Sequence, residues 1–86
     1  MEIKYKKDAF GEDTYSLGDF VIAVSHGHIR DRMVTMVEMR HEECGDTCRD
    51  CYLMDTEIKT GQCFHCGELN IPKEILALYY LLQNKD

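Results

Sequence analysis

Two pairs of cysteines constrain this chain more than any other feature of its sequence. Cys48 and Cys51 are separated by two residues, as are Cys63 and Cys66, and eleven residues lie between the pairs. Two cysteines three positions apart on a tight turn direct both sulfur atoms at one point, where backbone N–H groups stabilise the thiolates. A second such turn completes a tetrahedron around Zn²⁺, with Zn–S bonds of about 2.3 Å. The spacing therefore predicts one Zn²⁺ per chain, bound by these four cysteines.

The predicted donor set also limits the chemistry of the site. Four thiolates leave no coordination position for a reactive water, so the site is expected to be structural rather than hydrolytic. A structural Zn²⁺ contributes about 10–16 kcal/mol of apparent free energy in short finger peptides. This value is comparable to the whole stability of a small domain. We therefore expect metal binding and folding to be coupled.

Two alternatives for the cysteines stay open. Cys44 and His41 are substitute ligands for the first pair, and a second metal would need them together with other histidines. The segment 63–66 has a histidine between its two cysteines, which lowers thiol pKa values in some dithiol oxidoreductases. Those enzymes begin a long helix at the motif, whereas Gly67 and Pro72 interrupt a helix here. This interruption disfavours the dithiol alternative.

The chain is short enough for a metal to matter to its stability. Its 86 residues are 44% hydrophobic and 30% charged, which is typical of one small folded domain. The longest apolar run, residues 20–24, is far shorter than a membrane span, and the first residues do not form a secretory signal. We therefore expect residues 1–86 to form a single domain of a cytoplasmic protein that does not enter a membrane.

The charge of the chain bears on its partners. Sixteen acidic and ten basic residues give a net charge of −6 at pH 7, and the basic residues are scattered. A zinc site with four thiolates would make the total about −8. Such a field repels a phosphate backbone. A protein partner is therefore favoured over nucleic acid, for which Arg49 and Lys59 at the edge of the cysteine segment are the candidate contacts.

Residues 1–43 are expected to be mostly β. Alternating polarity predicts strands at residues 2–6 and 14–17, and the apolar run at 20–24 predicts a buried central strand. Residues 25–28, with His26 and His28, are expected to reverse the chain. Residues 29–41 fit both a helix and a strand, and their β-branched residues favour the strand. A short hairpin is expected within residues 52–62.

The last segment, residues 70–84, predicts a helix. Asn70 is the expected N-cap, Pro72 suits the first turn, and the apolar residues recur at helical spacing. The apolar stripe is too wide for one buried face, which predicts a surface that docks a protein partner or forms a homodimer seam. The residues of this predicted surface are Leu78, Tyr79, Tyr80, Leu81 and Leu82.

The segment from residue 44 to 69 resembles the zinc ribbons of transcription, translation and replication proteins. The four paired cysteines match the ligands of that group, and Gly67 matches the glycine after the second knuckle, whereas Tyr52 replaces the glycine after the first. The segment is also similar to a rubredoxin site, in which iron replaces zinc and carries electrons. The zinc-ribbon resemblance implies no activity by itself.

These observations together predict a small α+β domain with an antiparallel β-sheet, zinc-ribbon knuckles and one C-terminal helix. The sequence contains no recognisable nucleophile–base set, phosphate-binding loop or metalloprotease motif, so we do not expect an enzyme. We predict a small zinc-binding adaptor or regulatory protein that binds another protein, within transcription or nucleic-acid machinery. The alternatives are a nucleic-acid-binding zinc ribbon and a redox protein, either a dithiol or a rubredoxin-like electron carrier.

Overall fold

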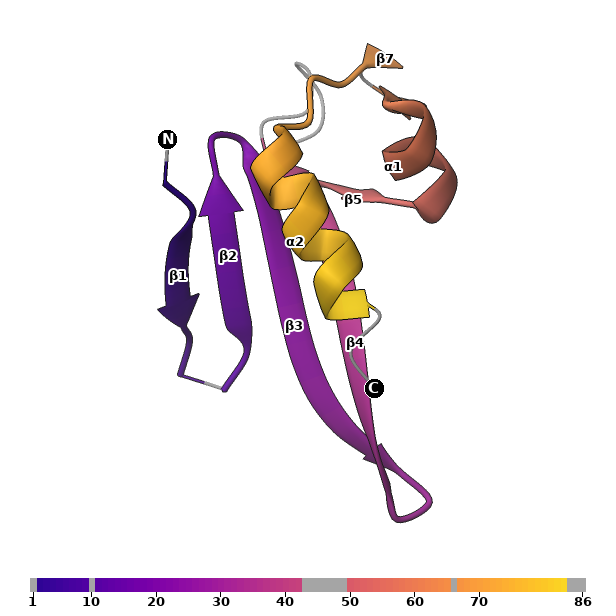
Figure 1. The fold of residues 1–86 in the computed structure, drawn as a ribbon. Helices are drawn as coiled ribbons and strands as arrows, with labels where there is room; N and C mark the ends of the chain where they lie inside the picture. Colours follow the sequence, from indigo (N-terminus) through magenta and orange to yellow (C-terminus); the bar gives the residue numbers. More distant parts are fainter. Residues whose placement is uncertain (1, 10, 43–49, 66, 84–86) are drawn as a thin grey trace.

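The fold is an antiparallel sheet with one long helix against it (Figure 1). The computed structural model describes residues 2–9, 11–42, 50–65 and 67–83. The five strands of the main sheet follow chain order, so each pairs with the next one: β1 (Lys4–Lys7), β2 (Asp13–Leu17), β3 (Phe20–Ile29), β4 (Arg32–Glu42) and β5 (Asp50–Leu53). The remaining elements are α1 (Asp55–Thr60), β6 (Gln62–Cys63), β7 (Gly67–Glu68) and α2 (Lys73–Gln83), of which β6 and β7 form a second, two-stranded sheet. The predicted class, a small α+β fold with an antiparallel sheet and a C-terminal helix, is confirmed.

The core lies between α2 and one face of the sheet. Side chains alternate between the two faces of a strand, and directly paired residues share a face. Ile22 pairs with Met39, and both are fully buried beneath α2 together with Ile75 of that helix. The same cluster extends to Cys51, Leu53, Ile58, Cys63 and Leu69. The cysteine segment therefore shares the core of the sheet.

The central hairpin confirms a strand for residues 32–41 of the predicted segment 29–41 and corrects the predicted chain reversal. The backbone continues straight through His26 and His28, and the chain turns at Arg30 and Asp31 instead. These two residues have φ values of +51° and +66°. A two-residue hairpin loop of type I′ has positive φ at both central positions, so that its twist matches that of the strands. The reversal predicted at residues 25–28 is therefore wrong, because these residues continue β3.

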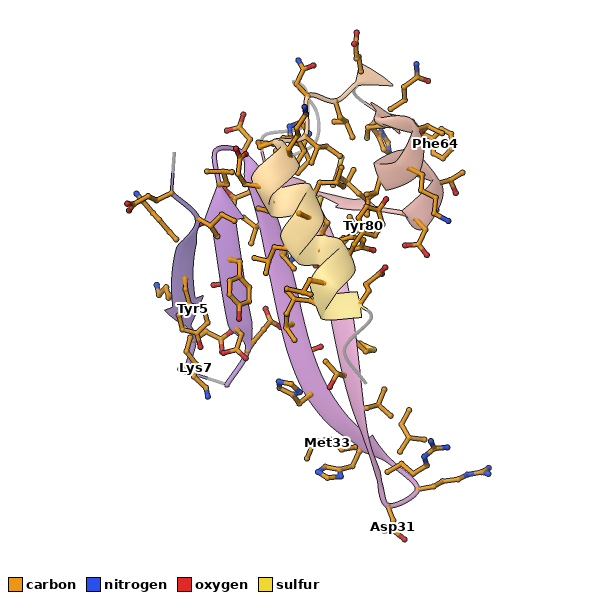
Figure 2. The ribbon with its side chains drawn as sticks, in the orientation of Figure 1. Tyr5, Lys7, Asp31, Met33, Phe64 and Tyr80 are labelled. Carbon is orange, nitrogen blue, oxygen red and sulfur yellow. The ribbon has the colours of Figure 1, made fainter. Side chains whose placement is uncertain are left out.

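The outer half of this hairpin extends beyond α2. Residues 20–24 are buried, whereas the following residues of β3 become exposed toward the turn. Figure 1 shows the end of the hairpin projecting away from the helix, and Figure 2 places Met33 and Asp31 on this projection. We call residues 25–36 the hairpin arm; Ser25 pairs with Met36 at its base.

The expected hairpin within residues 52–62 is wrong, because the chain forms helix α1 there. The backbone N–H of Met54, at the N-cap, donates to the Glu57 carboxylate, and Gly61 ends the helix with a φ of +70°. A side chain that returns from the third helical position to the N-cap stabilises a helix start, and glycine at positive φ is a common helix end. The usual cap residue types are missing at Met54, so the sequence carries little signal for this start.

Helix α2 confirms the predicted C-terminal helix but begins later than expected. The Leu76 N–H donates to the Pro72 carbonyl at 3.1 Å, so Pro72 and not Asn70 is at the N-cap. Within the described ranges, no helix is long and apolar enough to cross a membrane.

Candidate metal centre

The structure describes two of the four predicted zinc ligands. Cys51 lies in β5 and Cys63 in β6, and each is only 5% exposed within the common core cluster. Cys48, Cys66 and the substitute ligand Cys44 lie outside the described residues. One sulfur from each predicted half of the site is therefore buried in the same cluster, although the two residues are twelve positions apart in the chain.

The turn that follows Cys63 has two features expected of a metal-binding knuckle. The backbone N–H of His65 donates to Cys63 Sγ, with the nitrogen 3.4 Å from the sulfur. Cys63 pairs with Gly67 across the β6–β7 ladder, and Gly67 has a φ of +85°. A backbone N–H that points at the sulfur is the kind of donor that a metal-bound thiolate would accept from. Glycine adopts the positive φ of position 67 without strain.

Glu57 connects α1 to this turn and was missed by the sequence analysis. Its buried carboxylate accepts the N–H of Met54 at 3.0 Å on Oε1 and the N–H of Phe64 at 2.8 Å on Oε2. The hydrogen bond from Met54 is the main cause that lowers the pKa of Glu57, and the bonds from Phe64 and the Cys63 side chain add to it. Because Met54 is not a usual N-cap residue, the sequence carries no clear signal for the role of Glu57.

A backbone bond closes the segment behind Glu57. The Leu69 N–H donates to the carbonyl of Gly61 at 2.7 Å, and both Leu69 and Ile58 are buried. Helix α1 and the Cys63 turn are thus joined by the Glu57 side chain at one end and by this backbone bond at the other. The position of Cys63 is defined by these contacts.

The substitute ligand His41 lies beside Cys51. It pairs directly with Cys51 across the β4–β5 ladder, so the two side chains share a face of the sheet. The His41 ring also stacks on Phe20, with ring centroids 4.8 Å apart and an angle of 19° between the planes. This placement keeps His41 next to the first half of the predicted site.

No group of three or more histidine, cysteine or acidic side chains suited to a metal is found among the described residues. Only Cys51 and Cys63 of the predicted four ligands belong to that set. The four-cysteine site is therefore still a prediction, which rests on the spacing and on the geometry of the Cys63 turn.

The predicted docking residues on α2 differ strongly in exposure. Tyr79 is buried; its hydroxyl donates to Asp55 Oδ1 at 3.0 Å and accepts from Gln83 Nε2 at 2.6 Å. Burial is the main cause that raises the pKa of Tyr79, and the bond to Asp55 adds to it. Leu78, Tyr80 and Leu82 are half-buried against the core, whereas Leu81 is 67% exposed. Of the five residues, Leu81 is therefore the one that α2 presents to solvent.

A polar cluster on the hairpin arm was also missed. His26 Nδ1 lies 3.2 Å from Thr35 Oγ1, and its Nε2 lies 3.7 Å from Asp13 Oδ2. The Tyr5 hydroxyl donates to Asp13, and this bond is the main cause that lowers the pKa of Asp13. The residue types match a nucleophile, base and acid, but 3.7 Å is too long for the hydrogen bond that would orient the imidazole. Strand pairing brings these residues together, which spacing along the chain does not reveal.

The second histidine of the predicted reversal, His28, is exposed on the same arm.

Two apolar features mark the surface near the metal segment. Phe64, at the tip of the Cys63 turn, is 77% exposed and projects away from the sheet (Figure 2). An open groove of about 480 Å³ lies between β4, the end of β5 and the end of α2. Its lining combines apolar side chains such as Leu53 and Tyr79 with the acidic residues Glu38 and Asp55.

Comparison of the chain with protein-family models, with curated proteins and with solved structures yields no match.

Proposed function

We propose that this protein is a zinc-stabilised interaction module that binds another protein and holds its metal for structure. The observation that carries the proposal is the Cys63 turn, in which a buried sulfur accepts a backbone N–H and a glycine at positive φ follows. This is the local geometry that a tetrahedral thiolate site requires of each cysteine pair.

The described cysteines suit zinc in their position as well as in their chemistry. Cys51 is the second member of the first pair and Cys63 the first member of the second pair, and they come from different elements. A Zn²⁺ held by Cys48, Cys51, Cys63 and Cys66 would supply a cross-link between the end of the main sheet and the small β6–β7 sheet. Such a cross-link would stabilise this segment, because a helix of six residues and strands of two residues are not stable alone.

Protein binding is the activity that this surface supports best. Phe64 is a large aromatic side chain on a turn that Glu57 holds in place, and positioned aromatic anchors of this kind contribute much of the affinity in protein interfaces. Leu81 on α2 offers a second exposed apolar contact. The net charge of −6 favours a partner with a basic surface, such as a protein of the transcription or nucleic-acid machinery in the cytoplasm.

The metal is tested by native and denaturing mass spectrometry of protein purified under reducing conditions without added metal. We expect one zinc per chain, which is released on unfolding and is absent from Cys63→Ser. The matched control is Cys44→Ser, which we expect to retain zinc. Loss of zinc from the control would show that Cys44 is a zinc ligand in place of one of the four predicted cysteines. Bound iron would favour electron transfer, and a metal-free protein with reversible thiol oxidation would favour the dithiol alternative.

The protein-binding activity is tested with a photo-crosslinking phenylalanine analogue at position 64. We expect crosslinks to one protein from the cells that make this chain, and far fewer from the same analogue at Tyr5, an exposed aromatic on the opposite edge of the sheet. Equal yields at both positions would argue against a Phe64 surface. Nucleic-acid binding that weakens steeply with salt, and that Lys59→Glu abolishes, would favour the nucleic-acid alternative.

A further inference from the structure

The outer part of β4 is an open sheet edge. Within the described ranges, β5 pairs with β4 only at Met39–Glu42, so residues 32–38 have no strand on that side. This segment, Arg-Met-Val-Thr-Met-Val-Glu, contains two strongly exposed methionines, Met33 at 70% and Met36 at 54%. We call residues 32–38 the open edge.

The two edges of the main sheet differ in how they are protected. At the opposite edge, β1 has three lysines among its four residues, and all four are exposed. Lysines on an edge strand prevent another chain from pairing with it. The open edge has no lysine and no proline, and its central five residues, 33–37, are apolar or β-branched. An edge of this composition is suited to pairing with another strand.

The turn at the end of the arm determines which backbone groups face the open edge. In a two-residue hairpin the flanking residues, here Ile29 and Arg32, form a hydrogen-bonded pair, so the backbone groups of Arg32 face β3. Because these groups alternate sides along a strand, the N–H and C=O of Met33, Thr35 and Val37 face outward. The next outward residue, Met39, lies opposite Leu53 of β5, as this alternation requires.

We propose that a second copy of this chain pairs with the open edge, antiparallel and about a two-fold axis at Thr35. In this register Thr35 lies opposite Thr35 of the other copy, Met33 opposite Val37, Val34 opposite Met36, and Arg32 opposite Glu38. Every pair is favourable for side chains facing each other across strands: threonine with threonine, apolar with apolar, and a cation with an anion at each end. The segment is thus complementary to itself in charge as well as in polarity.

The same register satisfies the outward backbone groups. The three hydrogen-bonded pairs formed by Met33, Thr35 and Val37 with the other copy exchange about six backbone hydrogen bonds. The two five-stranded sheets join into one continuous sheet. Because the operation is a two-fold rotation that uses the same edge on both copies, the assembly closes at a dimer.

The groove at the end of β5 receives the other copy's turn in this arrangement. Residue 32 of that copy lies opposite Glu38, so the turn residues that precede it, Arg30 and Asp31, meet the end of β5, where the groove begins. Arg30 and Arg32 flank Asp31 at this turn and leave it with a net positive charge, and the groove has the acidic residues Glu38 and Asp55 on its lining. The basic turn and the acidic groove are therefore complementary in charge.

Exchange of the two end charges tests the register. Sedimentation velocity is measured on the full chain from about 1 to about 200 µM, a range that covers weak and moderate dimers. We expect a concentration-dependent dimer. Arg32→Glu and Glu38→Arg, made separately, each place two like-charged pairs across the axis and raise the dimer dissociation constant about tenfold. The combined variant restores both attractive pairs and returns the constant to within about threefold of the original.

The matched control is Lys6→Glu, a charge reversal on the opposite edge, which we expect to leave the dissociation constant unchanged. Circular dichroism on each variant checks that the fold is kept. A chain that is monomeric over the whole range overturns the proposal. The same holds if the combined variant dimerises more weakly than either single variant, if Lys6→Glu is as disruptive as Arg32→Glu, or if assembly continues beyond a dimer.

Discussion

The sheet beneath α2 and the cysteine segment, residues 50–69, share one core but are held together differently. Strands β3 and β4 have 10 and 11 residues, and their inner face meets α2 through fully buried Ile22, Met39 and Ile75. The cysteine segment has a helix of six residues and two strands of two residues each. Elements this short are not stable alone. The sheet depends chiefly on apolar burial, whereas the cysteine segment adds individual polar contacts and, in our proposal, zinc to the apolar side chains that it buries.

Truncation of Ile22 is expected to have the largest effect among single substitutions outside the cysteines. Ile22→Ala removes a fully buried side chain and leaves a cavity between the sheet and α2, so it lowers the free energy of unfolding by about 2–5 kcal/mol. The same substitution at Ile29, which is 62% exposed on the arm, changes it by no more than about 0.5 kcal/mol. Urea unfolding at one low protein concentration measures both. Similar losses at the two positions would show that burial beneath α2 does not determine how much a residue of β3 contributes to the free energy of unfolding.

Substitution of Glu57 tests whether polar contacts hold the cysteine segment. Glu57→Gln keeps the size of the side chain but leaves one oxygen where two now accept the N–H groups of Met54 and Phe64. We expect a loss of about 1–3 kcal/mol, because one buried donor then lacks its acceptor. Hydrogen exchange shows which part of the chain is destabilised. We expect the amides of residues 62–69 to exchange faster, while those of β3 remain protected.

The control for this substitution is Glu68→Gln, an exposed carboxylate in the same segment. We expect it to change the free energy of unfolding by less than about 0.5 kcal/mol. If exchange accelerates equally in β3 and in residues 62–69 of Glu57→Gln, the two regions unfold as one unit and the distinction between them does not hold.

The sheet was largely predictable because its strands carry the signal in their own sequence. The apolar run at 20–24 and the β-branched residues near Val34 lie in strands of the structure, and the alternation in residues 2–6 overlaps β1, which begins at Lys4. The turn was not predictable, because Arg30 and Asp31 adopt positive φ without a glycine. Helix α1 was not predictable because its start depends on Glu57. The Glu57 carboxylate is held in place partly by the N–H of the later residue Phe64, a contact that the local sequence does not reveal.

The candidate site shows the same division. Cysteine spacing predicts a ligand set that is still a prediction, whereas Gly67, whose effect is local to a few residues, is found at a turn with positive φ. The contact of the Tyr79 hydroxyl could not be predicted from the sequence. Helical spacing predicts that Tyr79 lies on an apolar face, but the position of α1 determines that its hydroxyl meets Asp55. Local chemistry is readable from sequence, whereas contacts between distant segments require the fold.

Tyr79 adds a side-chain hydrogen bond between the two regions, and its substitution has the smallest expected effect. Tyr79→Phe removes the hydrogen bond from α2 to Asp55 in α1 while keeping the buried ring. Asp55 and Gln83 are both exposed, so water replaces the lost hydroxyl for each of them. We therefore expect a loss of about 1 kcal/mol in urea unfolding at pH 7, and faster hydrogen exchange in α1 than in β3.

The pH dependence of this variant sharpens the argument. Burial and the Asp55 carboxylate raise the pKa of Tyr79 above the value of about 10 that it has in the unfolded chain. The folded state therefore binds the phenolic proton more tightly than the unfolded state. The resulting stabilisation is complete below pH 10 and is lost as the pH rises from 10 toward the folded pKa. The original chain should thus lose stability above pH 10 more steeply than Tyr79→Phe. Parallel curves would mean that the Tyr79 hydroxyl is hydrated in solution, and the link between α2 and the cysteine segment would then be apolar packing alone.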